Sequence, residues 1–120
     1  MIDPQGVPVL RVLLVEDDPG QSRLITEIFE MYGSTMTLAV AGSVQAGIER
    51  LATTDVDVVL LDLSLPDSEG AETVRRMSAS MRQIPVIILT GLDDTQIAIQ
   101  AIRDGAQEYL IKGRMDGELL

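Results

Sequence analysis

Short apolar runs, separated by longer amphipathic stretches, dominate the pattern of this chain. The runs lie at Val9–Val15, Val58–Leu61, Val86–Leu89 and Glu108–Ile111. A short run rich in β-branched residues is typical of a strand buried on both faces, as in a parallel sheet. A further stretch, Thr35–Ala41, alternates only weakly and predicts an edge strand.

Apolar residues recur at helical spacing between these runs. Pro19 suits the first position of a first helix, and Gly33 suits its C-terminal cap. Ser43 is suited to N-cap a second helix, and Asp94 a fourth, which Gly105 closes. The expected inward faces of the four helices are Leu24, Ile25, Ile28 and Phe29; Val44, Gly47, Ile48 and Leu51; Ala71, Val74, Met77 and Met81; and Ile97, Ala98, Ala101 and Ile102.

Strands that alternate with helices predict an α/β fold, with a doubly wound parallel sheet and right-handed crossovers. At 120 residues the chain has the length of one domain. We expect this domain at residues 9–120, after a loose lead-in at residues 1–8. The final Glu118-Leu119-Leu120 predicts the first turn of a truncated fifth helix. We therefore expect a domain excised from a longer chain that carries a further C-terminal partner domain.

Composition narrows the classes of function. The net charge of −10 argues against direct nucleic-acid binding, which needs a basic surface, and favours a bound cation. The chain has no cysteine and no histidine, so disulfides, thiolate metal sites and histidine general bases are excluded. No apolar stretch has the length of a membrane span, and the N-terminus lacks a signal-peptide layout. These features predict a cytoplasmic protein with no membrane partner.

Polar residues stand where four of the five expected strands end. They are the Glu16-Asp17-Asp18 cluster, Asp62, Thr90 and Lys112. Because the carboxyl ends of parallel strands meet at one edge of a sheet, we expect these side chains to converge there. Carboxylates this close repel one another unless a cation lies among them. With only oxygen ligands at hand, Mg²⁺ fits best, with Mn²⁺ as an alternative.

This group also has the chemistry to hold a phosphoryl group. A carboxylate can accept a phosphoryl group as an acyl phosphate. Lys112 would place a positive charge on that group, the Thr90 hydroxyl would donate to it, and Gly91 would leave room beside the backbone. Taken singly, an acid such as Asp18 more often caps a helix, and Lys112 would be an ordinary surface lysine. Their occurrence together, at successive strand ends, favours the functional interpretation.

These motifs resemble the receiver domain of bacterial two-component response regulators. The resemblance covers residues 10 to 120. It is carried by Val12-Leu13-Leu14-Val15-Glu16-Asp17-Asp18-Pro19, by Val59-Leu60-Leu61-Asp62-Leu63-Ser64-Leu65-Pro66 with Gly70, by Ile88-Leu89-Thr90-Gly91, and by Gly105-Ala106 with Tyr109-Leu110-Ile111-Lys112. It implies the flavodoxin-like receiver fold, with the strand order 2-1-3-4-5.

The resemblance also implies a role for each site residue. Asp62 would be the phosphoacceptor. Asp17, Asp62 and the backbone carbonyl of Ser64 would ligate Mg²⁺ directly, with Glu16 acting through water. Asp18 falls outside the family's acid pair and would cap the first helix. Thr90 and Tyr109 match the switch residues of the family, and Lys112 matches its lysine.

Two departures from the family pattern change the expectations. Gly113 stands where the family usually has a proline in a cis peptide. A cis bond before a non-proline residue costs about 2.5–4 kcal/mol, so we expect a trans bond or a reshaped loop there. The truncated fifth helix leaves homodimerisation open, because the family often pairs through the face that includes this helix.

The leading hypothesis is therefore a signalling switch rather than an enzyme. A sensor histidine kinase or a phosphotransfer protein would donate the phosphoryl group to Asp62, which would shift the domain toward an active conformation. One alternative is a degenerate receiver that acts as a non-phosphorylated docking module. Another is a magnesium phosphatase with Asp62 as nucleophile. The phosphatase is disfavoured because Ser64 occupies the position where such enzymes place a general acid–base.

Overall fold

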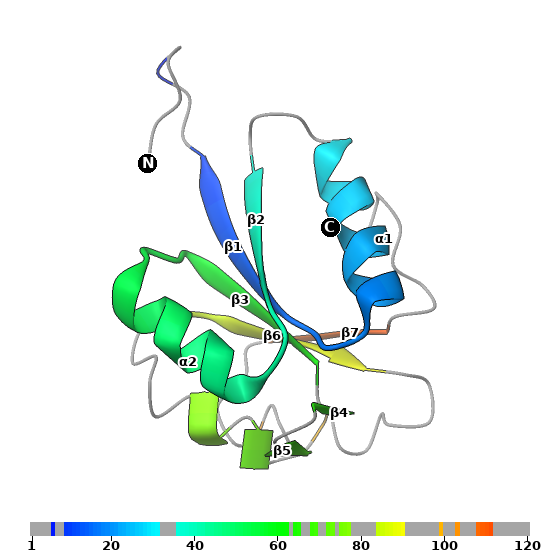
Figure 1. Ribbon diagram of the computed structural model, residues 1–120, viewed down its shortest axis with the longest axis vertical. Helices are drawn as coiled ribbons and strands as arrows, with labels where there is room; N and C mark the ends of the chain where they lie inside the picture. The colour runs from blue at the N-terminus through cyan, green and yellow to red at the C-terminus, as the bar shows by residue number, and fades with distance from the viewer. Residues whose placement is uncertain are drawn as a thin grey trace.

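A parallel sheet of five strands forms the centre of the protein (Figure 1). The computed structural model describes residues 6, 9–31, 36–62, 64–65, 68–69, 72–73, 75–77, 84–90, 99, 103 and 108–111. The strands are β1 (Leu10–Val15), β2 (Met36–Ala41), β3 (Val58–Asp62), β6 (Val86–Thr90) and β7 (Glu108–Ile111), and they lie in the order β2-β1-β3-β6-β7. The expected parallel sheet and its strand order are confirmed, as is the edge position of the strand predicted at Thr35–Ala41.

The central strands are apolar because both of their faces are covered. Leu13, Leu14 and Val15 of β1 are fully buried, as are Val59 and Leu61 of β3. The register aligns the ends of these two strands, since Val15 pairs with Leu61. The residues that follow Val15 and Leu61 therefore emerge together at the carboxyl edge of the sheet.

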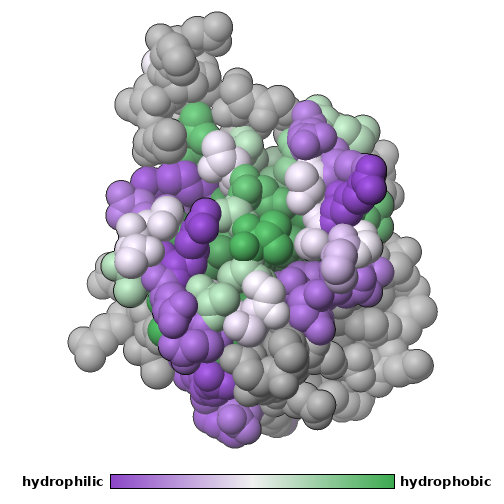
Figure 2. Space-filling model, viewed as in Figure 1, coloured by the Kyte–Doolittle hydropathy of each residue, from purple (hydrophilic) through white to green (hydrophobic). Residues whose placement is uncertain are grey.

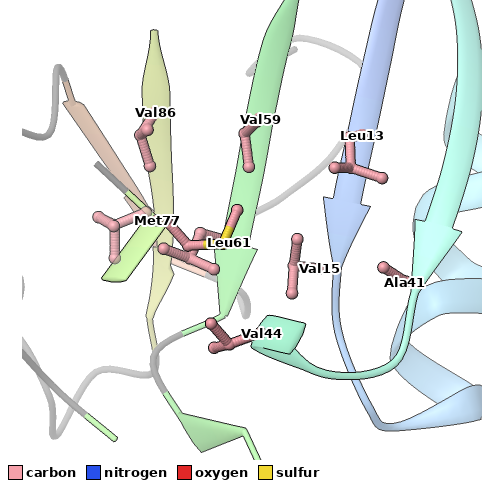
Figure 3. Close-up of a cluster of buried hydrophobic side chains, with 9 residues drawn as sticks. Leu13, Val15, Ala41, Val44, Val59, Leu61, Met77 and Val86 are labelled. Atoms are coloured by element: carbon pink, nitrogen blue, oxygen red, sulfur yellow. The ribbon is translucent and has the colours of Figure 1, made fainter. Parts of the chain in front are cut away.

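Helices lie on both faces of the sheet, which confirms the doubly wound architecture. Helix α1 (Pro19–Glu30) packs Ile25 and Phe29 against Val12, Leu14 and other residues of one face. Helix α2 (Val44–Thr53) lies on the other face, where Val44 joins the cluster drawn in Figure 3. That cluster joins Leu13, Val15, Ala41, Val44, Val59, Leu61, Met77, Val86 and Ile88.

The helix ends follow the capping residues in the sequence. Pro19 occupies the start of α1, and the Asp18 side chain accepts a hydrogen bond from the Gly20 amide. Ser43 N-caps α2 by accepting from the Ala46 amide at 3.1 Å. Helix α1 has its C-cap at Met31, so it ends before Gly33, which lies outside the described residues.

The inward face predicted for α1 is wrong at one residue, Leu24. Leu24 is 45% exposed, whereas Ile25, Ile28 and Phe29 are buried. Leu24 lies at the margin of the apolar stripe, and the sheet covers only the part of the stripe centred on Ile25, Ile28 and Phe29. Within the face predicted for α2, Val44 and Gly47 are buried, while Ile48 and Leu51 are partly buried against the core.

The segment after β3 contains a small hairpin. Strand β4 (Ser64–Leu65) pairs antiparallel with β5 (Ser68–Glu69). Residues 72–73 and 75–77 are helical, and Met77 of the predicted third helix is buried as expected. Ile99 and Arg103 are helical, within the span of the predicted fourth helix. The inward residues predicted for that helix, the start of a fifth helix and the Lys112–Gly113 bond lie outside the described residues.

No helix within the described part of the chain is long and apolar enough to span a membrane.

Candidate metal and phosphoryl site

Three carboxylates meet at the carboxyl edge of the sheet. Glu16 and Asp17 directly follow β1, and Asp62 is the last residue of β3. Because β1 and β3 are adjacent and parallel, with Val15 beside Leu61, these acids emerge next to one another. One carboxylate oxygen from each of Glu16, Asp17 and Asp62 lies within 4.8 Å of the others. The convergence predicted for these three residues is therefore present.

The three acids differ in their exposure to solvent. Glu16 is 2% exposed and Asp62 is 5% exposed, whereas Asp17 is exposed. Burying a carboxylate is costly unless hydrogen bonds or a cation compensate it. The arrangement thus places two buried acids beside one that reaches solvent.

Backbone hydrogen bonds fix the start of this cluster. The Glu16 amide donates to the carbonyl of Ala41 at 2.9 Å, which ties it to the end of β2. Oε1 of Glu16 accepts from the Asp18 amide at 3.2 Å. Asp18 turns its own side chain to the Gly20 amide, at 2.9 Å. Its predicted role as a helix cap outside the acid pair agrees with this geometry.

The donor set fits Mg²⁺. This ion prefers oxygen ligands at about 2.0–2.1 Å in octahedral geometry, so its adjacent ligand atoms lie about 3 Å apart and its opposite ones about 4.2 Å apart. The 4.8 Å limit on the three carboxylate oxygens is close to that range. Small side-chain movements, or a water bridge to Glu16, would complete the coordination.

The other predicted site residues are described only in part. Thr90 is the last residue of β6, one step beyond Leu89, which pairs with Asp62. This register puts the Thr90 backbone at the same edge as the acids. Tyr109 lies in β7 beside Ile88, and Ser64 is the first residue of β4. Gly91 and Lys112 lie outside the described residues, although Lys112 directly follows Ile111, the partner of Thr90.

The hairpin β4–β5 is a neighbour of the site that sequence reasoning missed. It begins two residues after Asp62, and Ser64 pairs with Glu69. The two residues between its strands are Pro66 and Asp67, and this combination favours tight turns. That pair was the available signal for a hairpin.

Comparison with known proteins places these observations in a family. A family model described as "Response regulator receiver domain" matches residues 12–120. The chain is 31% identical over 116 residues to the cell cycle response regulator CtrA of Brucella ovis, covering 92% of this chain and 47% of CtrA. The chain thus spans less than half the length of this curated relative.

Solved receiver domains have a similar structure. A response regulator receiver domain protein from Clostridium thermocellum superposes with a TM-score of 0.79 at 28% identity, covering 92% of this chain and 86% of that one. The receiver domain of the sensor histidine kinase PA1611 from Pseudomonas aeruginosa gives 0.77 at 26% identity, covering 92% and 91%. That structure has a magnesium ion coordinated in its active-site cleft.

Proposed function

Because this chain belongs to the response regulator receiver domain family, we propose that it is a signalling switch whose phosphoacceptor is Asp62. The observation that carries the proposal is the grouping of Glu16, Asp17 and Asp62, with an oxygen of each inside 4.8 Å. Grouping three carboxylates is costly for the fold, because like charges at this distance repel one another. Acids with only a structural role would not need to be grouped in this way.

In the proposed reaction, a carboxylate oxygen of Asp62 attacks the phosphorus of a phosphohistidine on a partner protein. The bond from phosphorus to the histidine nitrogen breaks, and that nitrogen leaves with the bonding electrons. These 120 residues contain no histidine, so the donor histidine lies outside them. A sensor histidine kinase or a histidine phosphotransfer protein is the proposed class of donor. Bound Mg²⁺ would supply positive charge to the phosphoryl oxygens.

The acids would act in distinct ways. Asp17 and Asp62 would hold the cation directly, together with the carbonyl of Ser64. Glu16 is anchored through its amide to Ala41 and would act through water. A nearly buried Asp62 is consistent with an acyl phosphate that is partly shielded from hydrolysis.

We further propose that the phosphoryl charge draws the Thr90 hydroxyl and Lys112 inward and that Tyr109 turns with them. The conformational equilibrium then shifts toward the active state. The size of the shift equals the free energy by which the new contacts favour the active state over the inactive one. The supporting fact is the backbone register, which brings Thr90 to the same sheet edge as Asp62. Since CtrA is about twice as long as this chain, we propose that the domain works with an output region of a larger regulator.

The test is phosphorylation by acetyl phosphate with Mg²⁺, followed by intact mass. The expected result is one phosphoryl adduct, absent from Asp62→Asn and from a sample with EDTA. Asp55→Asn is the matched control, because it removes an exposed acid that precedes β3, at the end opposite Asp62, and should retain the adduct. An adduct that persists in Asp62→Asn would contradict the assignment. A folded, Mg²⁺-binding chain without an adduct would favour the docking module.

A further inference from the structure

The carboxyl end of α1 carries an uncompensated negative charge. Its last turn contains Glu27 and Glu30 and no basic residue, and residues 31–35, which follow it, contain none either. The carbonyls at a helix C-terminus carry partial negative charge, so an acid beside them is unfavourable. Glu27 is paired with Arg23 at 3.4 Å, whereas Glu30 is exposed and makes no ion pair with the described residues. A positively charged group beside Glu30 would relieve this repulsion.

A hollow of about 170 Å³ opens at this end of α1, between the helix and strand β2. The surface that it exposes is mostly polar, and Thr26 and Glu30 contribute to it. The Thr26 hydroxyl donates to the carbonyl of Ser22 at 2.7 Å, so towards a further group its oxygen can only accept. The Glu30 carboxylate is also an acceptor. The polar groups of this hollow therefore suit a donor with positive charge.

The rest of the hollow suits the aliphatic stem of a lysine. Met36 and Leu38 of β2 line it and are partly buried, as part of the cluster beneath α1. A lysine side chain can lay its methylene groups on apolar surface while its ammonium group reaches a polar rim. A lysine that enters from the side of β2 would contact Met36 and Leu38 and end beside Glu30 and Thr26.

The opposite side of β2 has a different character. A hollow of about 260 Å³ lies there beside α2, and its exposed surface is mostly apolar. Its apolar lining consists of Val12, Leu38, Ala39 and Val56. The two arginines at this hollow, Arg11 and Arg50, are balanced by two nearby aspartates, Asp55 and Asp57, both of which pair with Arg11. This hollow therefore suits an apolar side chain.

Strand β2 between the two hollows lacks the features that usually protect a sheet edge. Its sequence, from Met36 to Ala41, contains no charged residue, no proline and no glycine. It ends the strand order and pairs only with β1 among the described strands. Figure 2, which looks onto this edge, shows an apolar area over β2 between hydrophilic surfaces over α1 and α2. Such an edge can pair with another chain through its amides and carbonyls.

The alternation of a strand matches the two hollows. Successive side chains of an extended segment point to opposite faces of a sheet, so a segment paired with β2 would direct alternate side chains toward α1 and toward α2. The net charge of −10 attracts a basic partner and opposes a second copy of the domain. The β2 strand of a second copy would also bring no lysine or arginine to Glu30.

We propose that β2 is a docking edge for an extended segment of a partner protein in which basic and apolar residues alternate. The segment adds a sixth strand to the sheet by backbone hydrogen bonding, as in other cases of β-strand addition. Its basic residues lie on the α1 side, with one of them beside Glu30, and its apolar residues enter the hollow beside α2. This proposal does not rest on phosphorylation of Asp62.

The test uses a capped probe peptide with the sequence Thr-Val-Lys-Val-Lys-Val-Thr, titrated into the isotope-labelled protein with Mg²⁺ present and followed by NMR. The expected result is a set of shifts at residues 36–41, with slowed amide exchange at alternate residues of β2. A peptide with both lysines replaced by glutamate should bind about tenfold or more weakly, because it adds charge of the same sign as Glu30 and the domain.

Two variants of α1 separate the charge at the hollow from the charge of the whole domain. Glu30→Gln should weaken binding of the lysine peptide about threefold or more. Glu27→Gln is the matched control, because it removes the same charge from an exposed residue of the same turn that lines neither hollow. It should leave the affinity unchanged.

Four outcomes would overturn the proposal. The first is the absence of shifts in β2 at millimolar peptide. The second is a set of shifts confined to residues 16–18 and 62, which would mean that the lysines bind the acids of the metal site. The third is an equal effect of Glu30→Gln and Glu27→Gln, which would mean that the peptide responds only to overall charge. The fourth is concentration-dependent dimerisation without peptide, seen by analytical ultracentrifugation together with shifts at residues 36–41, in which case the edge takes a second copy of this chain.

Discussion

Arg11 and Asp57, which are 46 residues apart in sequence, hold the amino-terminal ends of β1 and β3 together by four hydrogen bonds. The Arg11 guanidinium donates to both oxygens of the Asp57 carboxylate, each at 3.1 Å. The Arg11 amide also donates to this carboxylate at 2.7 Å, and the Asp57 amide donates to the Arg11 carbonyl at 2.8 Å. The pair fixes the register of the two strands whose other ends carry the acids of the site.

This pair makes stability depend on pH in a defined range. The hydrogen bonds from the Arg11 side chain and amide lower the pKa of Asp57 from 3.8 to about 2. The carboxylate therefore stabilises the fold above pH 4, and this contribution is lost as the pH falls from about 4 to about 2. We expect Asp57→Asn to lower the unfolding free energy at pH 7 by about 1–2 kcal/mol, a value reduced by partial solvent screening.

Urea unfolding of the wild type and Asp57→Asn at pH 7 and near pH 2.5 measures this effect. The difference between the two proteins should shrink at the lower pH. Asp55→Asn is the control, because the Asp55 side chain is 88% exposed and makes a single ion pair among the described residues, with Nη1 of Arg11 at 3.3 Å. A constant difference across pH, or an equal loss in Asp55→Asn, would contradict the assignment.

Gly47 allows α2 to approach the sheet at Val15. A Cβ at position 47 would lie 3.1 Å from Cγ2 of Val15, which is fully buried and has little room to move. Alanine would otherwise favour the helix by about 1 kcal/mol relative to glycine. We expect Gly47→Ala to destabilise the wild type by about 1 kcal/mol, yet to stabilise the Val15→Ala protein by about 0.5–1 kcal/mol.

A double-mutant cycle in urea measures this coupling. Gly42→Ala serves as the control, because nothing lies within 4 Å of a Cβ placed there, and it should change stability by less than about 0.5 kcal/mol. If Gly47→Ala had the same effect with and without the Val15 side chain, the close approach would not be what requires glycine.

The sheet could be predicted well, because strands that are buried on both faces consist of short apolar runs that can be recognised in the sequence. The runs that became β1, β3 and β6 contain few residues other than Val, Ile and Leu, and their ends were predicted to within one residue. The three acids could be predicted for the same reason. Once two strands are parallel neighbours, the residues that follow them have to meet.

Other features depend on tertiary contacts that have no recognisable sequence pattern. Helical periodicity placed Leu24 on the same stripe as Ile25, but the limited width of the packed face left it 45% exposed. The two-residue strands of the β4–β5 hairpin are too short to show a period. The sequence also could not indicate whether Asp55 or Asp57 accepts the two hydrogen bonds of the Arg11 guanidinium. That choice depends on the register of β1 and β3.

Asp18 is expected to contribute to stability through its cap on α1. Its carboxylate accepts from the Gly20 amide at 2.9 Å, which satisfies one of the free amides at the start of the helix. Replacing an N-cap aspartate with alanine costs about 1 kcal/mol, whereas asparagine caps nearly as well. We therefore expect Asp18→Ala, but not Asp18→Asn, to lower the unfolding free energy by about this amount. Thermal unfolding followed by circular dichroism would test it, and equal melting temperatures for the wild type and Asp18→Ala would refute the capping role.

Asp17 and Asp18 are neighbours in sequence, but we expect their substitutions to differ in their effect on Mg²⁺ binding. Asp17 shares the cluster with Glu16 and Asp62, whereas Asp18 is turned toward the helix. Removing one charged ligand from a hard-cation site should weaken Mg²⁺ binding at least about tenfold in Asp17→Asn. Asp18→Asn should bind within about twofold of the wild type, because its outer position changes only a screened charge.

Isothermal titration calorimetry suits this comparison, because the chain has no tryptophan to report binding by fluorescence. Both variants replace one aspartate by asparagine, so their net charges are equal and only the position of the lost carboxylate differs. An equal loss of affinity in the two variants would mean that Mg²⁺ responds to the overall negative charge of the acidic segment. A loss confined to Asp17→Asn would mean that the cluster of Glu16, Asp17 and Asp62 holds the ion.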